Sequence, residues 1–145
     1  MVTKVDKIKQ LITEKGDGAL LYLKYLNATF DDVYKAYDEL GQPLPIVSIQ
    51  NKSGVITSGG WGNGYVRIPE GHPFYGKEYN EIDVSVHGGL TFSEHVTITD
   101  GDVLPEGFWI GFDTFHHGDD SIYWTERRVL EETIHLFSQV YGLSN

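Results

Sequence analysis

The chain has 145 residues, a net charge of −10 and no cysteine. This length suits one domain with its own hydrophobic core, and the lack of cysteine excludes disulfides and thiolate zinc sites. The sequence has no apolar run of about 18 residues, so it predicts no membrane-spanning helix and no membrane partner. A strongly acidic surface repels phosphate backbones, so duplex nucleic acid is not expected as a partner.

The N-terminus begins with polar and charged residues and lacks the apolar stretch of a signal peptide. We therefore expect a cytoplasmic protein.

Helical spacing dominates residues 1–40. Apolar residues recur at helical intervals over about 3–15, and a Gly-Asp-Gly sequence is expected to end that helix. The apolar segment 19–26 favours a second helix because Leu and Ala dominate it. Thr29 is a typical N-cap for a third helix, with acidic residues in its first turn.

The composition changes at about residue 41, where glycines become frequent and helical spacing ends. Strands are predicted at 45–50, 64–68, 81–87, 90–98 and 108–113. The last of these is apolar at nearly every position, which is typical of a central strand covered on both sides.

A C-terminal helix is predicted over about 122–141, with Leu130, Ile134, Phe137 and Tyr141 on its apolar stripe and Gly142 as its C-cap. The sequence thus predicts one α+β domain over residues 1–145. In it, a helical layer (about 1–40) and the C-terminal helix pack on an antiparallel-rich sheet that carries a site (about 45–120).

The segment 82–87 alternates apolar residues with Asp83, Ser85 and His87. In a strand these three side chains share one face, where a carboxylate can orient an imidazole. Gly88-Gly89 is a typical hairpin turn and is expected to leave room for a substrate to approach.

The densest group of candidate ligands follows the strand 108–113. It consists of Asp113, His116, His117, Asp119 and Asp120. Three interpretations follow: a divalent metal site, metal-free acid–base or ligand-binding chemistry, or a polar loop without a role. Adjacent histidines diverge, so only one of the two is expected to face the site.

The glycine-rich stretch 59–76 does not match a nucleotide-binding loop, because a strand rather than a helix follows its glycines. The first interpretation is a tight turn into a strand. The second is a rim where Tyr65 offers a stacking surface, and His72 is the residue of the next turn expected to face a ligand.

These patterns predict one pocket at the ends of the strands 82–87 and 108–113. His87, Asp113 and His116 are the candidate catalytic residues. The candidate ligand-binding residues are Tyr65, His72, Asp83, Trp109 and Asp119.

The motifs Gly71-His72-Pro73-Phe74-Tyr75-Gly76, Asp83 to Ser93, and Trp109 to Asp119 occur in this order within residues 60–120. Together they resemble a family of small bacteriophage and prophage proteins with no assigned reaction. The resemblance implies a bacterial host cell and supports pairing the two central segments.

The leading hypothesis is a pocket that binds or hydrolyses a small nucleotide-like or other ring-bearing molecule, with a divalent metal ion as an open alternative. The rival hypothesis is an acidic accessory factor that binds a host protein without catalysis. A domain with no pocket is a third hypothesis. The sequence predicts neither the oligomeric state nor whether the protein is an enzyme.

Overall fold

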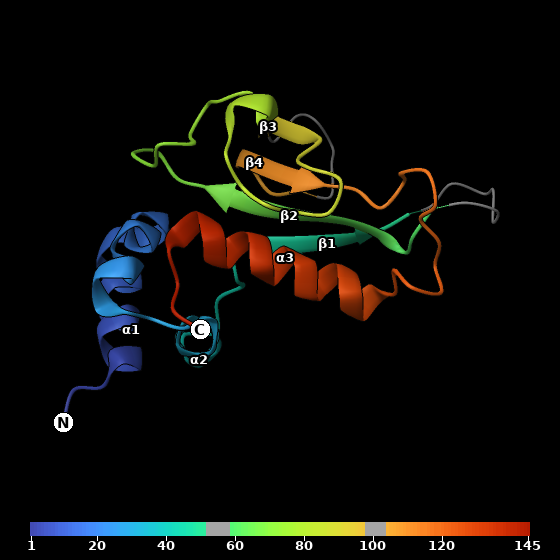
Figure 1. Cartoon of the computed structure of the whole chain (residues 1–145). Helices are drawn as coiled ribbons and strands as arrows, with labels where there is room; N and C mark the ends of the chain where they lie inside the picture. Colours follow the sequence, from blue (N-terminus) through green and yellow to red (C-terminus); the bar gives the residue numbers. More distant parts are fainter. Residues whose placement is uncertain (52–58, 98–103) are drawn as a thin grey trace.

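The computed structural model describes residues 1–51, 59–97 and 104–145. Three α-helices and a four-stranded antiparallel sheet form the fold, which confirms the α+β prediction. Figure 1 shows α3 lying along the sheet, the N-terminal helices at one end of the molecule and the connection from β4 to α3 at the other. No helix in the described ranges has both the length and the apolar character needed to span a bilayer.

Two of the N-terminal helices begin at capping boxes. The Thr3 hydroxyl accepts a hydrogen bond from the Asp6 N–H at the start of α1 (Lys4–Lys15), and Thr29 does the same at α2 (Phe30–Glu39), as predicted. No loop follows α1. The α-helix ends at Lys15 with Gly16 as its C-cap, which confirms the predicted end, and the chain continues directly as a 3₁₀ helix, η1 (Gly16–Leu26).

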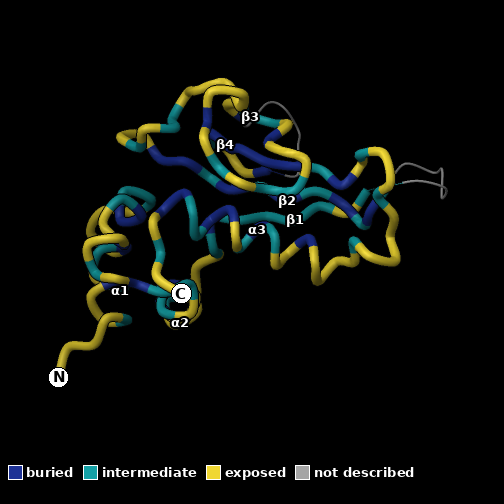
Figure 2. The backbone as a smooth tube through the Cα atoms, in the orientation of Figure 1, coloured by how far each residue is buried: buried dark blue, intermediate teal, exposed yellow. Residues whose placement is uncertain are grey.

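The sheet has the strand order β1-β2-β4-β3. Its strands are β1 (Ile46–Gln50), β2 (Gly62–Ile68), β3 (Phe92–Val96) and β4 (Gly107–Phe112). β4 is central, and Trp109 on one of its faces is as fully buried as Ile110 on the other. This confirms the prediction of a strand covered on both sides, and Figure 2 shows β4 coloured as buried along most of its length. The predicted strand 90–98 extends to residue 98, which lies outside the described residues.

The predicted strand at 81–87 is wrong. A short 3₁₀ turn, η2 (Tyr79–Glu81), leads into an extended segment that pairs with no strand among the described residues. Side chains of α3 take the place of a neighbouring strand: Gln139 accepts from the Ser85 N–H at 2.8 Å and donates to the Ser85 carbonyl at 2.7 Å. The apolar alternation is real, because Ile82 is buried in the main core.

The C-terminal helix α3 (Glu126–Tyr141) begins at the N-cap Thr125 and ends at Gly142 in the left-handed conformation, which confirms the predicted C-cap. It starts later than predicted because the Asp120 carboxylate accepts the Ile122 and Tyr123 N–H groups in a turn. The buried stripe is also rotated from the predicted one. Leu130 is 40% exposed, and the helix buries Val129, Thr133, Leu136, Phe137, Val140 and Tyr141.

Candidate functional site

The connection between β4 and α3, here called the site loop (residues 113–125), is fastened to the start of β2. The Gly60 N–H donates to the Thr114 carbonyl at 2.6 Å, and the Trp61 N–H donates to the Trp124 carbonyl at 2.8 Å. A Cβ at residue 60 would overlap the side chains of Thr114 and Trp124. The glycine at this position therefore serves close packing of backbone segments, in agreement with the tight-turn interpretation.

His87 and Asp119 meet at the centre of the candidate site. The Nε2 atom of His87 lies 2.9 Å from one oxygen of the Asp119 carboxylate and 3.0 Å from the other. The Asp119 side chain is 7% exposed, whereas that of His87 is 28% exposed. The same carboxylate accepts the His116 N–H at 2.9 Å. The pair thus consists of a buried carboxylate, fixed by hydrogen bonds, and a solvent-accessible imidazole.

The environment of Asp119 determines the tautomer of His87. Burial alone would raise the pKa of the Asp119 carboxyl, but the hydrogen bonds from the His87 ring and the His116 N–H, together with the charges of the two imidazoles, lower it below its ordinary value. An ionised carboxylate only accepts hydrogen bonds, so Nε2 of His87 must carry a proton. Its other ring nitrogen, Nδ1, has no hydrogen-bond partner among the described residues.

His116 lies beside this pair, with its ring centroid 5.4 Å from that of His87. Its Nε2 atom is 3.3 Å from an oxygen of Asp113, yet it is buried and makes no hydrogen bond with any described residue. A Cβ on Gly88 would overlap this nitrogen. The space that Gly88 leaves was expected to admit a substrate, and the structure fills it with the His116 ring instead.

The second histidine of the loop points away. His117 is exposed, and no described contact joins its side chain to the site. Asp120 caps a turn by accepting backbone N–H groups. The structure therefore assigns the inward position to His116, a choice that the sequence left open.

A small pocket adjoins the pair. Its volume is about 170 Å³, and its lining residues are Tyr123, Trp124, Arg128, Glu131 and Glu132. Two of these touch His87: the Trp124 ring lies 4.4 Å from the imidazole, centroid to centroid, and the Glu132 carboxylate accepts the His87 N–H at 2.7 Å. Arg128 lies over the Tyr123 ring at 4.2 Å. Aromatic surface, one guanidinium and two carboxylates thus line the pocket, and the His87 imidazole lies behind its Trp124 wall without lining it.

Three other predicted residues do not join this group. Trp109 is 1% exposed on the opposite face of the sheet, where its Nε1 donates to the Pro105 carbonyl. Asp83 is exposed and makes no described hydrogen bond. Tyr65 packs edge-on against Phe92; burial, and then the charge of nearby Asp113, raise the pKa of its hydroxyl.

His72 lies in a different part of the molecule and has both ring nitrogens engaged. Its Nδ1 accepts the Phe74 N–H at 3.0 Å, so its Nε2 carries the proton and donates to the Val140 carbonyl at 2.9 Å. Burial lowers the pKa of His72, and the positive charge of Lys24 lowers it further. This neutral histidine ties the turn at 71–74 to the end of α3.

The sequence also suggested a divalent metal ion. Within the described ranges no three His, Asp or Glu side chains are arranged to hold one. The Asp119 carboxylate accepts hydrogen bonds from the His87 ring and from the His116 N–H, so its role within the described residues is to orient the imidazole.

Three residues at or beside the site were not anticipated. Trp124 immediately precedes the N-cap of α3, where an apolar residue often packs back on the fold. Glu132 and Gln139 are seven residues apart, and this spacing places both on one side of α3, where they bind the 82–87 segment. This seven-residue spacing is visible in the sequence, but the sequence does not indicate that the two side chains bind the 82–87 segment.

Comparison with protein-family models found no match to this chain. Searches among curated proteins and among solved structures found no match either. The family resemblance carried by the three motifs is thus a prediction, and the functional argument rests on the geometry of the site.

Proposed function

We propose that the His87–Asp119 pair is an acid–base centre that acts on, or binds, a small ring-bearing molecule. The supporting observation is the hydrogen bonding of His87. A buried carboxylate holds its Nε2–H, and Nδ1 has no described partner. An imidazole in this arrangement can accept a proton at Nδ1 and return it, with the carboxylate stabilising the charged form.

The adjoining pocket limits the size of the ligand. A volume of about 170 Å³ is below the range of roughly 300–1,000 Å³ that is usual for whole small-molecule sites. It suits a single ring, for which Trp124 and Tyr123 offer stacking surfaces. Arg128 lies over Tyr123, and Glu131 and Glu132 line the same pocket. Two carboxylates beside one guanidinium disfavour a phosphate, so a nucleotide-like ligand would place its base here.

In this proposal His87 is the catalytic residue and Asp119 is its positioning partner. His116 and Asp113 have a supporting role, because Nε2 of His116 is buried and Asp113 accepts the Phe115 N–H within the loop. No metal ion is required for this chemistry.

A panel of nucleosides, nucleoside monophosphates and aryl esters tests the proposal, with turnover followed by NMR and binding followed at the Trp124 indole resonance. We expect a panel member to shift that resonance saturably, and any turnover to fall by roughly 10²-fold or more in His87→Gln. His117→Gln is the matched control, because His117 is exposed on the same loop, and it should behave as wild type.

Two results would overturn the proposal: no panel member shifts the Trp124 resonance, or His87→Gln and His117→Gln behave alike. The acidic accessory factor would then be the better hypothesis, since it needs no open imidazole nitrogen.

A further inference from the structure

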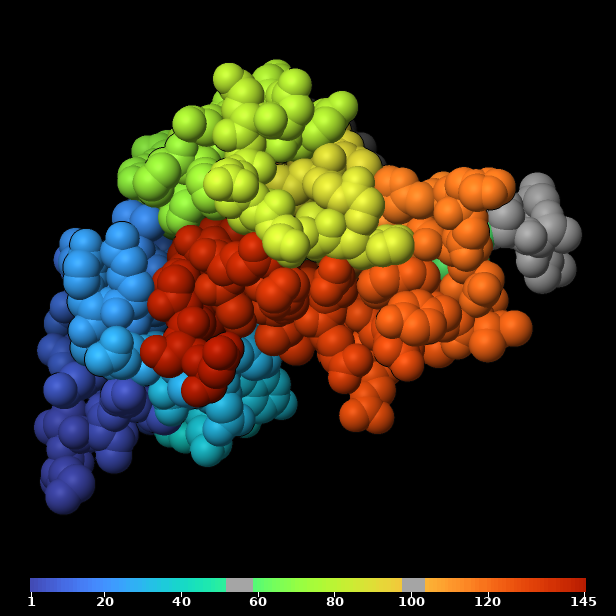
Figure 3. All heavy atoms as spheres, viewed as in Figure 1, coloured from blue at the N-terminus to red at the C-terminus, as the bar shows by residue number. Residues whose placement is uncertain are grey.

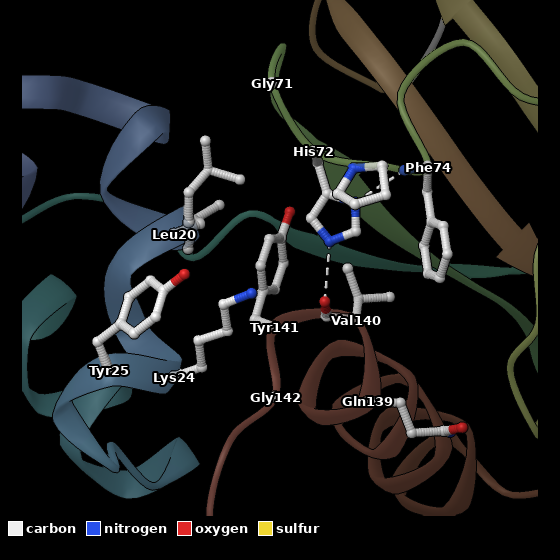
Figure 4. Close-up of a pocket in the computed structure, with 12 residues that line it drawn as sticks. Leu20, Lys24, Tyr25, Gly71, His72, Phe74, Gln139, Val140, Tyr141 and Gly142 are labelled. Carbon is white, nitrogen blue, oxygen red and sulfur yellow. Dashed lines mark hydrogen bonds between the residues drawn. The ribbon is translucent and has the colours of Figure 1, made fainter.

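A larger pocket lies at the other end of α3, away from the His87–Asp119 pair. Its volume is about 500 Å³, which is within the range of small-molecule sites. Three segments form its walls: η1, the turn at 71–74 and the last residues of α3. Figure 4 shows side chains from these segments directed towards one another, and Figure 3 shows the surface on which the segments meet.

The walls are mainly apolar and aromatic. Leu20, Phe74 and Tyr141 line the pocket, and Tyr25 stands at its edge with 73% of its surface exposed. His72 contributes only a ring face, because both of its nitrogens bind main-chain groups. The pocket therefore offers a place for a flat apolar group and no general acid or base.

Of the described residues that line this pocket, one is charged, namely Lys24. Lys24 has no carboxylate partner among the described residues, and its ammonium group lies 5.1 Å from the centroid of the Tyr25 ring. Figure 4 shows it directed towards Tyr141. Among the described residues no acidic side chain lines the pocket, although the chain carries a net charge of −10. A free cation beside aromatic walls is complementary to an anion with an apolar body.

A simpler role for Lys24 would be to balance the negative end of the α3 dipole. Three of the carbonyls of that last turn are already hydrogen-bonded, however. The Leu143 N–H donates to the Ser138 carbonyl, the Gly142 N–H to the Gln139 carbonyl, and His72 to the Val140 carbonyl. The ammonium group is thus not needed to satisfy them.

We propose that this pocket binds a small carboxylate with an aromatic or branched apolar body, and that Lys24 pairs with the carboxylate. A single ammonium group suits a monoanion. A phosphoryl group carries more charge and would need several donors, whereas this pocket offers one ammonium group to offset the negative end of the α3 dipole. This site is separate from the His87–Asp119 pair and does not depend on its function.

The test is a titration of the full ¹⁵N-labelled chain with 4-phenylbutyrate, and in parallel with the uncharged 4-phenylbutanamide. We expect saturable shifts for the amides of the η1 segment, the 71–74 turn and Gly142. Affinity for the carboxylate should be about fivefold higher than for the amide, and Lys24→Met should remove that difference, as expected for one partly exposed charge pair.

The chain offers a matched control in Lys15. It lies over the Tyr22 ring at the same 5.1 Å distance but does not line this pocket, so Lys15→Met should keep the fivefold preference. Leu21→Trp, which fills the pocket from its wall, should weaken binding of both probes. The proposal is overturned if neither probe gives saturable shifts at these amides, if both bind equally to the wild type, or if Lys15→Met and Lys24→Met lose the same affinity.

Discussion

His72 and His87 are both partly buried and both lie beside α3, but their hydrogen bonds differ. His72 uses one nitrogen to donate to the Val140 carbonyl and the other to accept the Phe74 N–H. His87 binds the Asp119 carboxylate with one nitrogen, and no described residue binds the other. An imidazole with both nitrogens on main-chain groups holds a fold together, whereas one held at a single nitrogen can exchange a proton.

Substitutions in the Gly88–Gly89 turn should disturb the packing around His87 most strongly. Both residues have positive φ angles, 69° and 79°, so alanine is strained at either one. Only at Gly88 would the new Cβ also overlap the His116 ring, while Gly89 faces open space.

We expect Gly89→Ala to lower the free energy of unfolding by about 1 kcal/mol through backbone strain, and Gly88→Ala to lower it by a further 1–3 kcal/mol, approximately, through overpacking. Urea unfolding of the two variants measures the difference. Equal losses would show that His116 does not pack against Gly88 as described.

For the structural histidine, His72→Gln should lower the free energy of unfolding by roughly 1–2 kcal/mol, because it disrupts two hydrogen bonds to partly buried main-chain groups. It should also change the pH dependence of stability. The pKa of His72 is lowered on folding from its ordinary 6.5, so the folded state favours the neutral ring. The resulting stabilisation is complete above pH 6.5 and is lost as the pH falls below 6.5 through the folded pKa.

Urea unfolding at pH 7.5 and at pH 5.5 measures this effect, and the decline between the two should be smaller in His72→Gln than in the wild type. Asp119 cannot account for a decline in that range. Its pKa is lowered from 3.8, so its contribution is complete above 3.8 and disappears only at lower pH. An unchanged decline in His72→Gln would contradict the structural role of His72.

The elements that could be predicted are those whose signal is local. The Thr29 cap and the Gly142 cap depend on their own side chain and backbone, and the burial of β4 follows from its apolar residues. The secondary-structure prediction failed where the conformation of a segment depends on a partner from elsewhere in the chain. The alternation at 82–87 indicates an extended segment with one buried face, but nothing within it reveals that α3 side chains, rather than a strand, bind its backbone.

The same reasoning explains which parts of the site were found. His87, Asp113, His116 and Asp119 are titratable residues within two positions of a glycine, and the structure brings all four together. Trp109 was expected at the site because it belongs to the same strand, but its position in the strand turns it to the opposite face. Trp124 was missed because its contact with His87 joins segments far apart in the sequence.

The most direct test of the central claim is the protonation of the two ring nitrogens of His87, measured by long-range ¹H–¹⁵N correlation at about pH 9, well above the ordinary histidine pKa of roughly 6.5. We predict a proton on Nε2 and a lone pair on Nδ1, a preference that Asp119→Ala should weaken while the His72 tautomer stays unchanged. A proton on Nδ1 of His87, or a tautomer indifferent to Asp119→Ala, would contradict the account.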